Sequence, residues 1–234
     1  MEETQKKSLY ESLVKEGNSL QKSGKYTEAL EKFQKAIDIN PNHYLAYYYM
    51  GNALRHLGNY KEAVSKYDMA IKIDKKNINS YLNKALALQK ISDYPGALEC
   101  YDLVIELNPN NSSPYLSKGY CLSNMQSYMK AVDCFDKAIQ LDPRDSQAYF
   151  NKGNALFNLK QFSEAINCYD KTIEYEPKNY FAFNNKGKIL ESYEMFEEAK
   201  NCYKKASEYN PNNQMYQDSM IRCIKKLEKF NIKE

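Results

Sequence analysis

Two histidines and six cysteines are the residues of this chain best suited to nucleophilic or metal chemistry. His43 and His56 have no cysteine or serine partner placed by a motif, as nucleophilic catalysis would require. The chain has no CxxC pair, no HExxH and no glycine-rich phosphate loop. The sequence therefore predicts a protein that is not an enzyme, with no catalytic residue, no metal site and no cofactor.

Four of the cysteines follow one another at a fixed spacing of 34 residues and each precedes an aromatic residue: Cys100, Cys134, Cys168 and Cys202. If that spacing reflects stacked pairs of helices, equivalent atoms lie about 10 Å apart, which exceeds the reach of a disulfide. Buried free cysteine behaves as a small hydrophobe. We therefore expect reduced packing residues here.

The same 34-residue period runs through most of the chain. Pro109, Pro143, Pro177 and Pro211 keep it without drift, and Lys75 takes the proline position one period earlier. Small residues recur at two further positions, first Gly17, Gly51, Ala85, Gly119, Gly153 and Gly187, then Ala29, Ala63, Ala97, Ala131, Ala165 and Ala199. Bulky residues recur between them, namely Tyr47, Tyr81, Tyr115, Tyr149 and Phe183, with Leu54, Leu88, Leu122, Leu156 and Leu190. Small residues let two helices approach closely, and the bulky ones predict the core around that contact.

Within one period the apolar spacing predicts two amphipathic helices joined by a short turn. Tyr26, Tyr60 and Tyr94 follow turn-forming residues and begin the second helix, and Pro95 fits its first turn. The period predicts six repeats between a polar arm over 1–9 and a capping helix over 214–234: 10–43, 44–77, 78–111, 112–145, 146–179 and 180–213.

These residues resemble the tetratricopeptide repeat family over residues 10–213. Three positions depart from the family pattern, with Lys75 for proline, Ala85 for glycine and Thr172 for alanine, and no repeat carries the early tryptophan. The resemblance implies an all-α, right-handed superhelical solenoid of helix-turn-helix repeats. It also implies that the first helices line a concave groove that holds a peptide of a partner protein.

Carried over position by position, the resemblance places a set of polar, aromatic and basic residues in that groove: Asn18, Asn52, Asn83, Asn151, Asn154, Asn184, Asn185, Tyr48, Tyr49, Tyr120, Phe150 and Lys188. Asparagine amides both donate and accept, so they can pair with a peptide backbone whatever its side chains. Two interpretations stay open. The asparagines bind a peptide, or they bond between neighbouring helices, with Tyr48 and Phe150 as packing residues.

Two other kinds of partner match the sequence less well. Family members that grip a chaperone's C-terminal carboxylate use cations together with asparagines. The asparagine part is present, but uncharged residues hold the cation position: Val14, Tyr48, Leu82, Leu116, Phe150 and Asn184. RNA-binding helical repeats need a basic groove, whereas the cations here are scattered, so we expect no nucleic acid.

The pattern predicts a protein-interaction scaffold that helps assemble a multiprotein complex. A polar N-terminus and the lack of an apolar run approaching 18 residues predict a cytoplasmic protein without a membrane span. The net charge of +3 is ordinary for such a protein. Chaperone cofactors, cytoskeletal or ciliary assembly subunits and transport adaptors all fit this pattern. The basic amphipathic segment over 214–234 could also mediate self-association.

Overall fold

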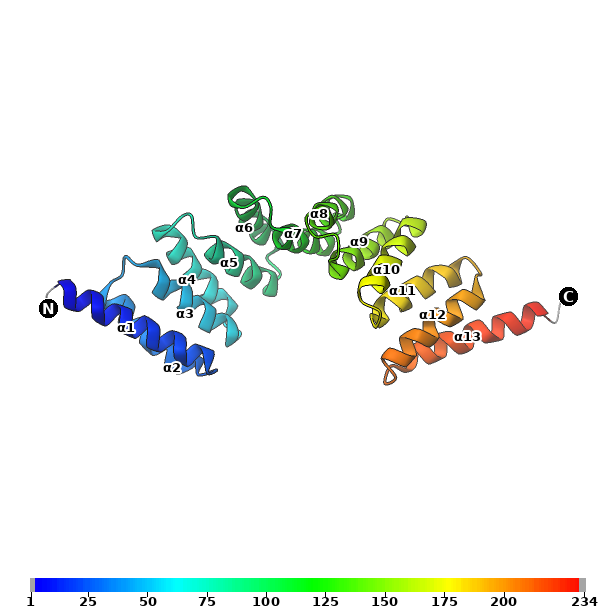
Figure 1. Ribbon diagram of the computed structural model, residues 1–234, viewed down its shortest axis with the longest axis horizontal. Helices are drawn as coiled ribbons and strands as arrows, with labels where there is room; N and C mark the ends of the chain where they lie inside the picture. Colours follow the sequence, from blue (N-terminus) through cyan, green and yellow to red (C-terminus); the bar gives the residue numbers. More distant parts are fainter. Residues whose placement is uncertain (1–2, 232–234) are drawn as a thin grey trace. The chain divides into compact units, whose positions relative to one another are not determined.

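The computed structural model describes residues 3–231, leaving 1–2 and 232–234 outside the described part. Over residues 3–231 the chain forms thirteen α-helices and no strand, which confirms the predicted all-α class (Figure 1). The helices are α1 (Glu3–Lys22), α2 (Tyr26–Ile39), α3 (Tyr44–His56), α4 (Tyr60–Ile73), α5 (Ile78–Lys90), α6 (Tyr94–Leu107), α7 (Ser112–Asn124), α8 (Tyr128–Leu141), α9 (Ser146–Asn158), α10 (Phe162–Tyr175), α11 (Tyr180–Ser192), α12 (Phe196–Tyr209) and α13 (Gln214–Asn231). None of them combines the length and apolar character needed to cross a bilayer.

The chain divides into two compact units, with the boundary between Cys121 and Leu122 inside α7. In the first unit consecutive helices from α1 to α6 pack against one another, and in the second unit consecutive helices from α8 to α13 do the same. Each unit is therefore a stack of helical hairpins, and the fold is an α-helical repeat solenoid. We call the odd-numbered helices α1 to α11 the first helices, and the even-numbered α2 to α12 the second helices.

One contact recurs between the two helices of a hairpin. Each second helix carries an aromatic residue, 1% exposed or less, at one position of the 34-residue frame: Phe33, Tyr67, Tyr101, Phe135, Tyr169 and Tyr203. We call these six the ring residues. A Cβ atom added at Gly17 would lie 2.5 Å from the ring of Phe33, and one at Gly51 would lie 2.6 Å from that of Tyr67. The small residue of the first helix is therefore the surface on which the ring lies.

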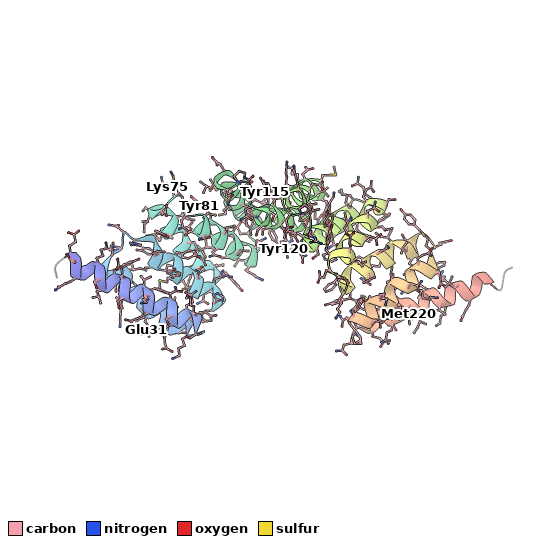
Figure 2. All side chains as sticks on the ribbon, viewed as in Figure 1. Glu31, Lys75, Tyr81, Tyr115, Tyr120 and Met220 are labelled. Atoms are coloured by element: carbon pink, nitrogen blue, oxygen red, sulfur yellow. The ribbon has the colours of Figure 1, made fainter. Side chains whose placement is uncertain are left out.

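The first-helix aromatics are less buried than the sequence led us to expect. The predicted leucines are 4–7% exposed, and Tyr47 is buried. Tyr81 and Tyr115 (Figure 2), Tyr149 and Phe183 are only half-buried. The ring residues, not this row, are the deepest large side chains of the hairpins.

The turn inside each hairpin uses one backbone conformation. Its second residue is left-handed, with φ between 59° and 83°, and is glycine only at Gly24 and Gly58; the others are Ser92, Gln126, Lys160 and Glu194. The N–H of the next residue donates back to a leucine carbonyl of the first helix at 2.9 Å, for example Asn59 to Leu54. This bond satisfies a carbonyl that the helix end leaves open. The second helices then start at Tyr26, Tyr60 and Tyr94, as predicted.

The remaining sequence expectations concern the junctions and the two ends. Lys75 (Figure 2) stands where proline was expected, yet the Asn77 N–H donates to the Asp74 carbonyl at 3.2 Å, just as Asp145 donates to Asp142 at 3.3 Å. The junction therefore forms without proline. The predicted arm over 1–9 is helical from Glu3 onward as part of α1. The predicted cap over 214–234 is helical as α13, and its last three residues lie outside the described part.

Replacing Gly51 with alanine tests the ring contact. The new methyl group would meet the buried ring of Tyr67, so we expect a loss of about 1–3 kcal/mol in the free energy of unfolding. Urea denaturation measures it, and Ser65→Ala on the exposed side of α4 is the control, expected to change stability by at most about 0.5 kcal/mol. Unchanged stability of the Gly51 variant would contradict the packing described here.

Candidate functional site

The asparagines predicted for the groove form inter-repeat pairs in the first unit. Asn52 Oδ1 accepts from the Tyr67 hydroxyl at 2.8 Å and from Asn83 Nδ2 at 3.0 Å. Asn83 Nδ2 also donates to the Tyr48 hydroxyl at 3.2 Å. One amide pair thus connects two first helices, a buried ring residue and a half-buried tyrosine.

The second unit repeats this arrangement one hundred and two residues later, which is three periods. Asn154 Oδ1 accepts from the Tyr169 hydroxyl at 3.0 Å and from Asn185 Nδ2 at 2.9 Å. Asn184 Nδ2 donates to Asn185 Oδ1 at 3.1 Å. Asn184 itself is only 4% exposed, and its Oδ1 is buried without a partner. Asn184 is therefore a core residue and not the open groove position that the sequence predicted.

Some hydrogen-bonding capacity of the amide pairs is left over. Three amide atoms make no hydrogen bond to any described residue, namely Asn52 Nδ2, Asn83 Oδ1 and Asn154 Nδ2. These atoms are not among the buried unpaired ones, and their residues are half-buried. The ring tyrosines thus orient each pair while leaving polar atoms in contact with solvent.

The remaining predicted residues differ in exposure. Tyr49 stacks on Phe33 with ring centroids 5.8 Å apart, and Phe150 lies 6.2 Å from Tyr169 and 6.3 Å from Phe181. Tyr120 (Figure 2) is 49% exposed and Lys188 is exposed, whereas Asn18 and Asn151 are half-buried. Phe181, which is 51% exposed, lies on a first helix beside Phe150. In each unit, we call the predicted residues other than buried Asn184, together with Phe181 in the second unit, the first-helix face.

A related rule about the ring residues was not visible in the sequence analysis. Tyr101 donates to Gln89 Oε1 and Tyr203 donates to Glu191 Oε2, both at 2.8 Å and both twelve residues back along the chain. Two ring residues are phenylalanines, Phe33 and Phe135. Twelve residues before them, Gln21 Oε1 and Ser123 Oγ are buried and unpaired. Comparing Tyr with Phe at this one position would have located those atoms.

Ion pairs at the junctions were also missed. A lysine of a first helix contacts an aspartate of the preceding second helix in four copies: Lys84 with Asp68, Lys118 with Asp102, Lys152 with Asp136 and Lys186 with Asp170. The lysine position holds Met50 at the first junction and Met220 (Figure 2) at the last, and both methionines pack against buried clusters. The spacing of 34 residues was the available signal. Half-exposed pairs of this kind contribute about 0–1 kcal/mol each.

The thiols have surroundings unsuited to reaction. The six cysteines are thiols and not disulfides, and burial raises the pKa of Cys100, Cys168 and Cys202 to about 11. A thiol with such a pKa is protonated at neutral pH and a poor nucleophile. No group of three or more His, Cys, Asp and Glu side chains within residues 3–231 could hold a metal ion.

A known protein family matches this chain over most of its length. Family models of the tetratricopeptide repeat match residues 14–78, 78–111, 113–145, 146–179 and 182–213. The chain belongs to the tetratricopeptide repeat family. A search of curated proteins finds no match.

Several solved structures share the fold. PilF of Pseudomonas aeruginosa has a TM-score of 0.74 at 17% identity, and the match covers 93% of this chain and 99% of the PilF chain. MamA of Desulfovibrio magneticus RS-1 has a TM-score of 0.70 at 23% identity, with coverages of 73% and 97%. YrrB, described as a TPR protein with an unusual peptide-binding site, has a TM-score of 0.66 at 22% identity, with coverages of 80% and 96%. At these identities the likeness concerns the fold alone.

Beyond the last tetratricopeptide hairpin, α13 is fixed by a charged network. Arg222 donates to both Glu191 oxygens, Nε to Oε1 at 2.5 Å and Nη2 to Oε2 at 2.8 Å. The same carboxylate accepts from the Tyr203 hydroxyl. The Arg222 guanidinium lowers the pKa of Glu191, and Tyr203 and the nearby Lys226 act in the same direction against the effect of burial. One carboxylate thus connects α11, α12 and α13.

The ring rule gives a pair of opposite predictions. Phe33→Tyr should stabilise the fold by about 0.5–1.5 kcal/mol because its hydroxyl can donate to the unpaired Gln21 Oε1. Tyr101→Phe should destabilise it by about 1–3 kcal/mol because Gln89 Oε1 loses its donor. Urea denaturation measures the change in the free energy of unfolding for both variants. A destabilised Phe33→Tyr variant would show that the hydroxyl cannot reach Gln21.

The carboxylate network predicts a pH dependence. The folded pKa of Glu191 lies below its unfolded value of about 4.3, so its contribution is present above that pH and is lost as pH falls through the folded pKa. Glu191→Gln should cost about 1 kcal/mol at pH 6, a figure reduced for the exposure of Arg222, and progressively less below about pH 4. Urea denaturation curves at pH 6 and below about pH 4 measure this cost in the free energy of unfolding. The exposed Glu194→Gln is the control, and a cost independent of pH would refute the assignment.

Proposed function

We propose that this tetratricopeptide repeat chain is a non-catalytic scaffold that holds a segment of a partner protein on the first-helix face and so helps assemble a protein complex. The main support is the leftover hydrogen-bonding capacity of the amide pairs. Asn52 keeps an unused Nδ2 donor and Asn83 an unused Oδ1 acceptor, and the two residues are already joined by a bond of 3.0 Å from Asn83 Nδ2 to Asn52 Oδ1. A peptide backbone offers the complementary carbonyl and N–H groups.

Preorganisation makes such a pair suitable for binding. Free asparagine side chains lose rotamer freedom when a ligand orders them, which reduces affinity. Here the Tyr67 and Tyr169 hydroxyls hold Asn52 and Asn154 in place before any ligand arrives. The interpretation as inter-helix bonds and the interpretation as peptide contacts are therefore compatible, since Asn52, Asn83 and Asn154 each have one amide atom bonded between helices and one left for a ligand.

Exposed aromatic side chains beside the amides supply apolar contact. Phe181 is 51% exposed on α11, next to Phe150 and four residues before the amide of Asn185. Tyr120 on α7 is 49% exposed. Aromatic residues with a polar neighbour are common anchors at protein interfaces. Each unit thus offers an aromatic anchor and an oriented amide pair on its own first helices.

The charge of this face argues for a ligand other than a carboxylate tail. The position that would carry the carboxylate-binding cation is buried at Val14 and Asn184, and is half-buried and uncharged at Tyr48 and Phe150. Recognition would therefore depend on backbone amides and apolar side chains, which tolerates variation in the bound sequence.

Asn154→Asp tests the proposal without removing the structural bonds. The carboxylate still accepts from Tyr169 and Asn185, but the Nδ2 donor is gone. For uncharged peptides selected by phage display on the wild-type chain, we expect affinity to fall about threefold to tenfold, the value of one hydrogen bond. Isothermal titration gives the dissociation constants.

The exposed Asn201 on α12 provides the matched control, because Asn201→Asp adds the same charge on a second helix. Phe181→Ala should weaken binding further with unchanged helicity. Selected peptides that bind Asn154→Asp and Phe181→Ala as tightly as wild type would place binding elsewhere and overturn the proposal.

A further inference from the structure

The exposed side of α13 is a surface distinct from the first-helix face. Six side chains on it line a hollow of about 420 Å³: Asp218, Ile221, Arg222, Lys225, Lys226 and Lys229. Their spacing of three and four residues places them on one side of the helix. Met220, Cys223 and Leu227 on the opposite side pack against the last hairpin. We call these six residues the terminal basic face.

This face has an excess of positive charge. It holds four cations and one carboxylate. Within residues 3–231 the Arg222 guanidinium is paired with Glu191, Lys226 acts on the same carboxylate at longer range, and Asp218 accepts from Gln214 Nε2 at 3.0 Å. Within residues 3–231, no acidic group lies within 4 Å of the lysine ammonium groups of Lys225, Lys226 or Lys229. These three lysines are exposed and lie within about 6 Å along the helix axis, four residues at 1.5 Å each. An acidic ligand would compensate a charge that the chain leaves unpaired.

Ile221 shows that the face is not prepared for another hairpin helix. In the 34-residue frame it occupies the position of Gly51, Gly153 and Gly187, where added Cβ atoms would lie 2.6–3.0 Å from a ring. An isoleucine there prevents a second helix from packing as the ring residues do. Ile221 is instead 44% exposed, an apolar side chain among cations. A partner of the terminal basic face must stay farther from α13 than a second helix stays from its first helix, and it must offer both apolar and acidic groups.

We propose that the terminal basic face binds an acidic amphipathic helix of a partner protein. Its glutamates or aspartates, spaced by three and four residues, pair with Lys225, Lys226 and Lys229, and an apolar residue covers Ile221. A membrane fits less well, because a surface-bound helix inserts an apolar face and that of α13 is already buried against the hairpins. Single-stranded nucleic acid fits less well, because the face has no aromatic side chain for stacking.

The test uses a fluorescein-labelled helical peptide of about 18 residues, with glutamates at helical spacing and two leucines on the same side, and its glutamine counterpart. We expect anisotropy to report binding of the glutamate peptide that weakens with added salt. Lys225→Glu with Lys226→Glu and Lys229→Glu should reduce affinity at least about tenfold, and Ile221→Ser about threefold. The lysines are exposed, so circular dichroism should show an unchanged fold.

The control is Lys72→Glu with Lys75→Glu and Lys76→Glu, three exposed lysines at the end of α4 and the following turn, which make the same change in net charge. Less than about a twofold effect is expected there. Equal losses in both triple variants, or no binding of the glutamate peptide, would overturn the proposal. So would α13-dependent binding to phosphatidylserine vesicles without peptide binding, or α13-dependent dimerisation in sedimentation velocity that blocks the peptide.

Discussion

The contact between a ring residue and the small residue of the preceding helix determines how each hairpin is built. A Cβ atom at Gly17 or Gly51 would overlap the ring, so the distance between the two helices depends on its absence. The rings are almost completely buried, and a close-packed interior transmits any change in their position to the neighbouring helices. The regular stacking within each unit follows from repeating this one contact.

The same contact determines the polarity of the first-helix face. A ring that lies across a glycine points its para position at the first helix, so a tyrosine there delivers a buried hydroxyl to the polar side chains of the first helices. In the structure that hydroxyl reaches either an asparagine fifteen residues back or a side chain twelve residues back, as for Asn52 and Gln89. Core packing and surface amide orientation are therefore coupled, and a ring phenylalanine leaves polar atoms such as Gln21 Oε1 unpaired.

Much of the fold could be predicted because a period of 34 residues fixes which positions are equivalent. It located the starts of second helices such as Tyr60 and the small residue that receives each ring. The period says little about how far a side chain reaches or which way a helix is rotated. For this reason it missed the ion pairs of Lys84 and its equivalents, and it could not distinguish buried Asn184 from half-buried Asn185. The division into six repeats with an arm and a cap, and the role of the first-helix face, stay predictions.

The two kinds of junction respond to ionic strength in opposite ways. Where lysine meets aspartate, dissolved ions screen the attraction, and where Met50 or Met220 packs instead, excluded salts such as sulfate strengthen apolar burial. Concentrated sulfate should therefore tighten the first and last junctions while weakening the ion pairs at the four between them. At this position the end junctions therefore depend on apolar burial, whereas the four junctions between them carry a salt-sensitive ion pair.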